Sequence, residues 1–147
     1  MKSKRINIVS IKAVKESSLL YKERSVRSPE DGYNLLKLFL EDKDREYFIV
    51  IALNTKNEPV AINTCHIGSL NASIVHPREV MKLGILSNAA SIIVGHNHPS
   101  GQPSPSKEDI EVTERLKKAG VILGIELLDH IIVGDESFVS LKEKGYI

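Results

Sequence analysis

Cysteine is almost missing from this sequence, since Cys65 is the single thiol among 147 residues. A lone cysteine excludes both an intramolecular disulfide and a cysteine-rich zinc site. Because chains without disulfides are typical of reducing compartments, we expect a cytoplasmic protein.

Long apolar runs are missing as well. The strongest run, residues 48–53, is about a third of the roughly 20 residues that a membrane-spanning helix needs. The first ten residues are basic, but Asn7, Ser10 and Lys12 interrupt the apolar residues around them, so no signal-peptide core forms. We therefore expect no membrane contact.

The chain also lacks a strong net charge, because 20 Lys and Arg oppose 19 Asp and Glu. The balance is uneven, however: residues 1–28 hold eight Lys or Arg and two Glu, whereas the remainder holds twelve and seventeen. Such a basic segment can make weak contact with nucleic acid, or it can be a solvated strand and linker. Tyr21 is its one aromatic residue, and both interpretations stay open.

Hydrophobic periodicity predicts a series of strands. Loose alternation over residues 6–14 indicates a half-exposed strand, and the continuous apolar run of residues 46–54 indicates a strand buried on both faces. A polar turn connects that run to residues 59–67, which completes a hairpin. Shorter strands are expected over residues 90–96, over residues 125–133 and near Phe138.

Three helices are expected between these strands. Ser28 followed by Pro29 is typical of an N-cap, so a helix begins there and runs to about residue 41. Its buried stripe should comprise Leu35, Leu36, Leu38, Phe39 and Leu40. The second helix covers residues 77–87, and the third runs from Ser106 to about Gly120.

This order of elements predicts an α/β (α+β) fold in which a central mixed β-sheet is flanked by helices on both sides. The length is that of one compact domain with its own core. We expect residues 1–28 to be a basic N-terminal strand and linker, and residues 29–147 to form the domain.

Two histidines and an aspartate are the residues best suited to carry chemistry. His96 and His98 are two apart at a strand end, so both point to the same side while Asn97 faces away. The loop after them is long enough to bring Asp109, in the first turn of the next helix, over the strand end. Two imidazoles and one carboxylate leave a fourth tetrahedral position open, as in a catalytic zinc site. By themselves, the same residues are also compatible with surface histidines and a helix-capping carboxylate.

The spacing resembles the JAMM metalloprotease signature, also called JAB or MPN-plus: His-x-His-Pro, six residues, Ser, two residues, Asp. Its defining positions are occupied without a gap by His96, His98, Pro99, Ser106 and Asp109. The neighbouring residues resemble the bacterial RadC branch, and the resemblance covers roughly residues 28–140. It implies a JAB/MPN-like fold related to the cytidine deaminase-like fold. It also implies bound Zn²⁺ and hydrolysis of a peptide or isopeptide bond in a peptide or protein substrate.

The resemblance implies roles for two more residues. The family uses a glutamate at the start of a buried strand as its general base, and Glu46, directly before Tyr47, holds that position. Without the resemblance, Glu46 is one solvated acid in a polar run. The family's serine corresponds to Ser106, whose hydroxyl either donates to the developing oxyanion or only caps the helix.

Rival functions stay open beside hydrolysis. RadC proteins carry a DNA-repair name, so the resemblance also admits a protein that binds DNA or a DNA-bound partner and whose metal site is not peptidolytic. A metal-binding module without turnover is a third possibility. Zinc deaminases share the implied fold, but they need a Pro-Cys-x-x-Cys motif that a chain with one cysteine cannot supply.

Two further pairs contain a histidine. Cys65 and His66 are adjacent in a strand, so their side chains point to opposite faces and cannot form a catalytic dyad. Asp129 and His130 lie in an apolar strand, where they either support the metal ligands or serve only the structure of the strand.

Overall fold

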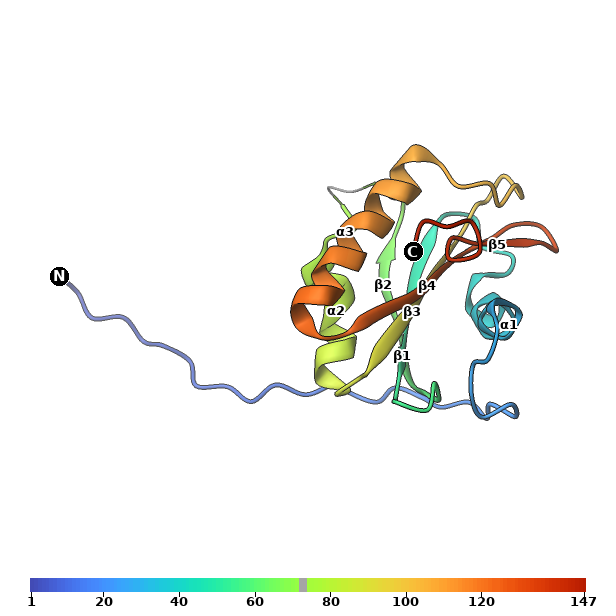
Figure 1. The fold of residues 1–147 in the computed structure, drawn as a ribbon. Coiled ribbons are helices and arrows are strands. Elements are labelled where there is room, and N and C mark those ends of the chain that lie inside the picture. The colour runs from blue at the N-terminus through green and yellow to red at the C-terminus, as the bar shows by residue number, and fades with distance from the viewer. Residues whose placement is uncertain (72–73) are drawn as a thin grey trace.

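The computed structural model describes residues 1–71 and 74–147 and shows a five-stranded sheet between helices (Figure 1). The strands are β1 (Tyr47–Leu53), β2 (Pro59–Ile67), β3 (Ser91–Asn97), β4 (Glu126–Val133) and β5 (Phe138–Ser140). The helices are α1 (Pro29–Leu40), α2 (Pro77–Leu86) and α3 (Lys107–Leu123). The strand order is β2-β1-β3-β4-β5; β3 and β4 are parallel, and the other neighbours are antiparallel. This mixed sheet confirms the predicted α/β fold.

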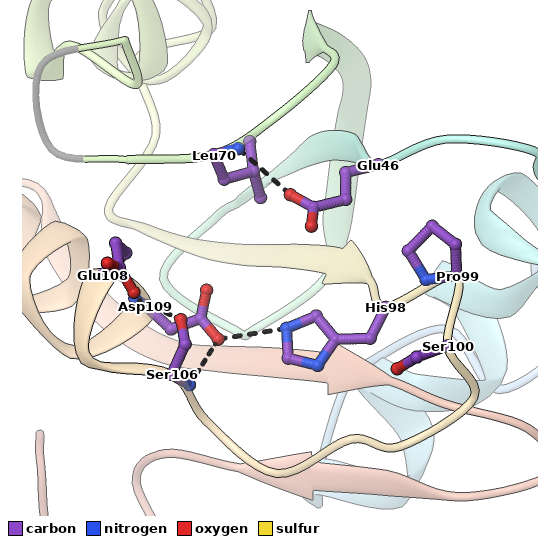
Figure 2. Close-up of a pocket in the computed structure, with 8 residues that line it drawn as sticks. All are labelled: Glu46, Leu70, His98, Pro99, Ser100, Ser106, Glu108 and Asp109. Atoms are coloured by element: carbon purple, nitrogen blue, oxygen red, sulfur yellow. Dashed lines mark hydrogen bonds and ion pairs between the residues drawn. The ribbon is translucent and has the colours of Figure 1, made fainter.

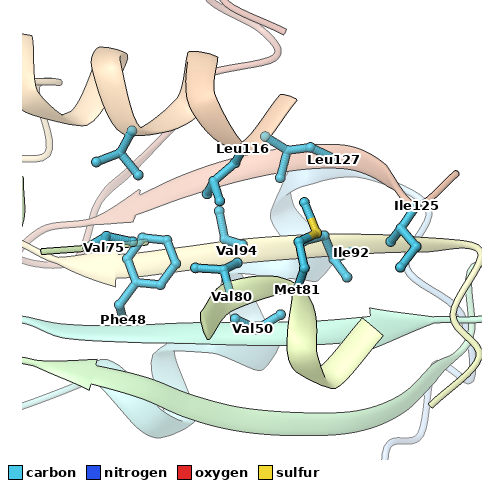
Figure 3. Close-up of a cluster of buried hydrophobic side chains, with 11 residues drawn as sticks. Phe48, Val50, Val75, Val80, Met81, Ile92, Val94, Leu116, Ile125 and Leu127 are labelled. Carbon is cyan, nitrogen blue, oxygen red and sulfur yellow. The ribbon is translucent and has the colours of Figure 1, made fainter. Parts of the chain in front are cut away.

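The helices cover both faces of the sheet, as expected (Figure 1). On one face α1 packs Leu35 and Leu36 against β1, β3 and β4. On the other face α2 and α3 enclose the second core, in which Val80, Met81 and Leu116 meet the apolar side chains of the sheet (Figure 3). Because β1 lies between the two cores, Phe48–Leu53 is fully buried, and this explains why its sequence is apolar without interruption.

The helix boundaries follow from local capping. The Ser28 side chain accepts a hydrogen bond from the Asp31 N–H, and α1 begins at Pro29 as expected. The C-terminal end of α3 is Leu123, three residues beyond the predicted end. The helix stops there because Gly124, and not Gly120, adopts the left-handed conformation that terminates a helix. No helix in residues 1–71 or 74–147 is both long and apolar enough to cross a membrane.

The prediction for Leu38 is wrong, since that side chain is 65% exposed. With a helix turn of 100° per residue, Leu36 and Leu40 lie on one face, whereas Leu38 lies about 200° from Leu36 and faces solvent. The core-facing stripe of α1 therefore uses Leu35, Leu36 and Leu40, with Phe39 partly buried at its margin.

The strand predicted over residues 6–14 is wrong too. Residues 1–20 form no helix or strand and are exposed, and they extend away from the sheet (Figure 1). Alternation shows that a segment suits one face of a sheet, but a strand also needs a neighbouring strand for its backbone hydrogen bonds. The chain first packs against the domain at Tyr21, and Arg24 then pairs with Glu58. The next contact is made by Val26, whose N–H donates to the Asn57 carbonyl and whose side chain is buried.

Candidate metal centre

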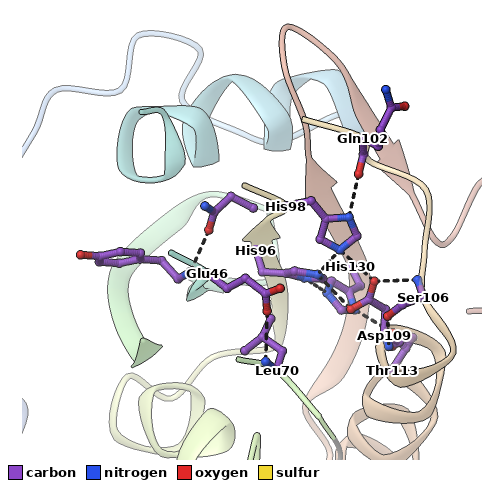
Figure 4. Close-up of polar contacts among 11 residues, drawn as sticks. Glu46, Leu70, His96, His98, Gln102, Ser106, Asp109, Thr113 and His130 are labelled. Carbon is purple, nitrogen blue, oxygen red and sulfur yellow. Dashed lines mark hydrogen bonds and ion pairs between the residues drawn. The ribbon is translucent and has the colours of Figure 1, made fainter. Parts of the chain in front are cut away.

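His96, His98 and Asp109 meet where β3 ends and α3 begins. The alternation of β3 turns both imidazoles to the same side, and the loop that follows returns the chain so that the first turn of α3 faces them (Figure 4). The Nε2 atoms of His96 and His98 are 3.1 Å apart, and each lies 3.0 Å from an oxygen of Asp109. The structure thus brings together the three residues that the spacing singled out.

The three ligand atoms are suited to hold a cation. His96 is 0% and Asp109 4% exposed, and the His98 side chain is 15% exposed on the open side. Burial opposes ionisation of Asp109, but hydrogen bonds with His96 and His98 outweigh it and hold the pKa of that carboxyl well below its usual range. The same contact with Asp109 raises the pKa of His98. The ionised Asp109 carboxylate therefore favours a positive charge beside the two imidazoles, and a divalent metal ion can supply that charge.

The ligand separations also fit a metal ion. Nitrogen and oxygen atoms about 2.0–2.2 Å from a tetrahedral zinc lie roughly 3.3–3.6 Å from one another. His96 Nε2 is 3.0 Å from Asp109 Oδ1, His98 Nε2 is 3.0 Å from Asp109 Oδ2, and the two nitrogens are 3.1 Å apart. One ligand atom from each residue lies within 4.8 Å of the other two, so the group is a candidate metal site.

The backbone of the loop after β3 orients His98. Its Nδ1 lies 2.7 Å from the Gln102 carbonyl oxygen, which can only accept a hydrogen bond (Figure 4). In the uncharged ring, a proton on Nδ1 leaves a lone pair on Nε2, the atom that faces Asp109 and His96; in the protonated ring, Nε2 also carries a hydrogen and donates it to Asp109. The loop keeps this shape because the Gly101 N–H donates to the His98 carbonyl and the His98 N–H to the Val133 carbonyl.

Buried side chains surround His96. Its Nδ1 lies 2.8 Å from His130 Nε2, and His130 Nδ1 lies 2.7 Å from the Thr113 hydroxyl. The Phe48 ring stacks on His96 with centroids 6.1 Å apart and meets His130 edge-on at 5.7 Å. Burial lowers the pKa of His130 well below its usual value. His130 is therefore an uncharged neighbour of the candidate ligand set.

The pair Asp129 and His130 is divided between the two faces of β4. While His130 contacts His96, the buried Asp129 carboxylate accepts hydrogen bonds from the Ser140 hydroxyl at 2.6 Å and the Lys142 N–H at 3.1 Å. Burial raises the pKa of Asp129. Asp129 thus connects β4 to β5 and the C-terminal turn, away from the His-His-Asp group.

Glu46 faces the same cavity as the candidate ligands His98 and Asp109 (Figure 2). Its Oε2 accepts a hydrogen bond from the Leu70 N–H at 3.0 Å, and its carbonyl accepts one from the Gly68 N–H at 2.8 Å. The cavity measures about 380 Å³, and it is lined by Glu46, Leu70, His98, Pro99, Ser100, Ser106, Glu108 and Asp109. The partly buried Glu46 therefore lines one open space together with His98 and Asp109.

Ser106 caps α3 through its oxygen. Its Oγ accepts a hydrogen bond from the Asp109 N–H at 3.1 Å, and Asp109 Oδ2 accepts one from the Ser106 N–H at 2.8 Å. This reciprocal capping box fixes the ligand carboxylate to the helix start. Because the cap uses a lone pair of the hydroxyl, the hydroxyl hydrogen can still donate toward the cavity.

Sequence reasoning missed Leu70 and Thr113. Leu70 acts through its backbone N–H, so its side chain gives no signal. Thr113 lies four residues after Asp109 in α3, on the same side of the helix, and this spacing could have revealed it. The exclusion of a cysteine dyad fits the structure: Cys65 packs against the core of α2 and α3, and His66 instead contacts the Ser69 carbonyl.

Comparison with known proteins places the chain in a family. The family model described as "RadC-like JAB domain" matches residues 26–146. Among curated proteins, a UPF0758 protein of Geobacillus sp. (strain WCH70) is 59% identical over 132 residues, which are 89% of this chain and 58% of that protein. The UPF0758 protein YsxA of Bacillus subtilis (strain 168) is 57% identical over 122 residues, which are 83% of this chain and 53% of that protein.

A UPF0758 protein of Caldanaerobacter subterraneus subsp. tengcongensis is 60% identical over 122 residues, which are 83% of this chain and 52% of that protein. The chain thus spans little more than half the length of these curated relatives. The family model covers nearly the whole chain beyond the exposed N-terminal segment, including the His-His-Asp group. The chain therefore belongs to the RadC-like JAB domain family.

Proposed function

We propose that this chain is a zinc-dependent hydrolase that cleaves peptide or isopeptide bonds in a peptide or protein substrate. The observation that supports it best is the shared cavity: His98 and Asp109 of the His-His-Asp group line it together with Glu46. A metal-binding module without turnover has no need of a carboxylate at this place.

The residues that would hold the metal are His96, His98 and Asp109. Two imidazoles and one carboxylate are the donor set of many catalytic zinc sites. A zinc ion held there would act as a Lewis acid toward the scissile carbonyl and would lower the pKa of water to about 7. His98 is partly exposed and lines the cavity, so the group is accessible from that side. A substrate can enter there.

Glu46 would act as the general base and then as the acid. The Leu70 N–H holds its Oε2, and this contact fixes the direction of the carboxylate (Figure 2). Its Oε1 can then take a proton from the attacking water and deliver it to the leaving amine. Ser106, whose hydroxyl hydrogen is not needed for the cap, would donate to the carbonyl oxygen of the substrate as negative charge develops there.

Metal content tests the ligand set first. We expect about one zinc per chain in the purified or reconstituted protein, and loss of that zinc in His98→Ala and in Asp109→Ala. His76→Asn is the matched control, because it removes a histidine outside the site and keeps a good N-cap for α2. A protein that takes up no zinc after reconstitution would rule out the proposal.

Glu46→Gln separates a hydrolase from a binding module. We expect it to keep its zinc and to lose cleavage of a peptide and isopeptide library by about 100-fold or more, since the amide cannot accept the proton. Glu41→Gln changes an exposed acid just after α1 and should leave cleavage unchanged. Equal turnover in Glu46→Gln and the unsubstituted protein would contradict the assigned role.

A further inference from the structure

A chain of hydrogen-bond contacts leads from the backbone of α3 to the candidate metal ligand His96 (Figure 4). The Thr113 hydroxyl lies 2.7 Å from the Asp109 carbonyl oxygen and 2.7 Å from His130 Nδ1. His130 Nε2 then lies 2.8 Å from His96 Nδ1. Thr113, His96 and His130 are each 0% exposed, so no water competes for these contacts.

We propose that Thr113 and His130 are positioning residues that fix the tautomer of His96, so that its Nε2 presents a lone pair to the metal. This inference rests on the proposed metal centre and goes beyond it, because neither residue is a ligand.

The direction of the chain follows from its first contact. A carbonyl oxygen can only accept, so the Thr113 hydroxyl hydrogen must point to the Asp109 carbonyl. The Thr113 oxygen then has only lone pairs to offer, and His130 Nδ1 must carry the proton. The buried His130 is uncharged, since a fully buried imidazolium without a contacting carboxylate is very costly, so His130 Nε2 accepts. His96 Nδ1 therefore donates, and His96 Nε2 is left with a lone pair.

The opposite direction would place two lone pairs against each other at the first contact. If the Thr113 hydroxyl donated to His130, the Thr113 oxygen and the Asp109 carbonyl would face each other at 2.7 Å without a proton. In the direction proposed, the contacts without a proton are instead those that His96 Nε2 makes with Asp109 Oδ1 at 3.0 Å and with the Nε2 of uncharged His98 at 3.1 Å. A cation bound at that point removes the conflict. The direction of the chain and a metal at the His-His-Asp group thus support each other.

The two histidine ligands are oriented by different means. The Gln102 carbonyl at the surface sets the proton of His98, whereas a buried path through two side chains sets that of His96. The path begins at the backbone of Asp109, which is itself a candidate ligand. The group that contacts His96 Nδ1 is the neutral imidazole of His130 and not a carboxylate. Among these contacts, Asp109 therefore supplies the only negative charge.

Zinc affinity, measured by competition with a chromogenic chelator, tests the proposal. We expect Thr113→Val, which keeps the side-chain shape, and His130→Leu, which keeps the bulk, each to weaken zinc binding by about 10- to 100-fold. His130→Gln places an acceptor near the Nε2 position and a donor toward Thr113, so it should stay within about threefold of the unsubstituted protein. Val112→Ala, in the same helix turn, should lower the melting temperature and leave zinc affinity unchanged.

Nitrogen-15 NMR of the zinc-loaded protein is the second measurement, and it reports which ring nitrogen of His96 carries the proton. A merely structural role of Thr113 and His130 makes no prediction about that position. We expect His96 to carry its proton on Nδ1 and to bind zinc through Nε2, without need of any variant. Zinc present, but with a proton on His96 Nε2 or with unchanged affinity in Thr113→Val and His130→Leu, would overturn the positioning role and leave the metal centre intact. An unsubstituted protein that takes up no zinc would overturn both proposals.

Discussion

Asn97 holds the backbone on both sides of Glu46. Its side-chain oxygen accepts a hydrogen bond from the Tyr47 N–H at 2.7 Å, and its side-chain nitrogen donates one to the Arg45 carbonyl at 2.9 Å. The same alternation that turns the neighbouring histidines of β3 toward Asp109 turns Asn97 toward this segment. One strand end thus positions both candidate histidine ligands and the candidate general base.

Asn97→Ala should destabilise the protein by about 1–3 kcal/mol, because the Tyr47 N–H and the Arg45 carbonyl lose the buried Asn97 side chain as their partner. Urea unfolding measures this change. Zinc content should persist, since the ligands are unaltered, while cleavage should fall as Glu46 loses its fixed position. Asn63→Ala, on exposed β2, is the control and should change stability by less than about 0.5 kcal/mol. Equal effects of the two substitutions would contradict this role of Asn97.

Gly120→Ala should destabilise the protein, although alanine normally favours a helix over glycine by about 1 kcal/mol. A Cβ at Gly120 would clash with the Ile125 carbonyl oxygen, and this backbone cannot move freely because the Glu126 N–H pairs with Ala90. We expect a loss of about 1–3 kcal/mol in thermal or urea unfolding. Val121→Ala, at a 79% exposed position of the same helix, should be neutral or slightly stabilising. A more stable Gly120→Ala protein would show that the clash is relieved.

The parts that could be predicted from the sequence are those set by neighbours along the chain. Ser28 with Pro29 gave the start of α1, and the unbroken apolar run of β1 revealed a strand between two cores. The spacing of His96 and His98 gave their common direction, because strand alternation is a local property. Each of these inferences needs fewer than ten consecutive residues.

The parts that could not be predicted depend on contacts between distant segments. His130 reaches His96 only because β4 lies parallel to β3 in a register that pairs Val94 with His130. Asn97 reaches the backbone beside Glu46, some 50 residues earlier, only because β1 lies on the other side of β3. Periodicity gives the faces of each strand but does not identify its neighbour, and for the same reason alternation alone wrongly predicts a strand over residues 6–14.

Cys65 should resist thiol reagents in the folded protein. Burial raises the pKa of its thiol from 9.0 to about 12, so at pH 8 the reactive thiolate is about a thousandfold rarer than in the unfolded chain. We expect negligible reaction with a disulfide reagent at pH 8 until urea unfolds the protein. The neutral buried thiol stabilises the fold fully below pH 9, and this contribution is lost as the pH rises toward 12.

A matched variant tests whether burial of the thiol, and not a slow reagent, protects Cys65 from reaction. The double substitution Cys65→Ser with Thr64→Cys moves the thiol to the adjacent exposed position of β2. This thiol should react quickly in the folded protein. Rapid reaction of Cys65 in the unsubstituted folded protein would contradict the raised pKa of this half-buried thiol.

Removal of residues 2–20 should leave the domain intact, because these residues are exposed and extend away from the sheet. The free energy of unfolding should change by less than about 0.5 kcal/mol, and zinc content should not change.

The deletion removes five Lys or Arg and one Glu. If the basic segment contacts phosphates, binding to duplex DNA should weaken steeply with added salt and vanish in the deleted protein. The triple substitution Lys2→Ala, Lys4→Ala and Arg5→Ala keeps the length of the segment and should reduce the salt dependence. Unchanged DNA affinity in the deleted protein would place any nucleic-acid contact on the domain itself, and the extended segment would then be a solvated linker.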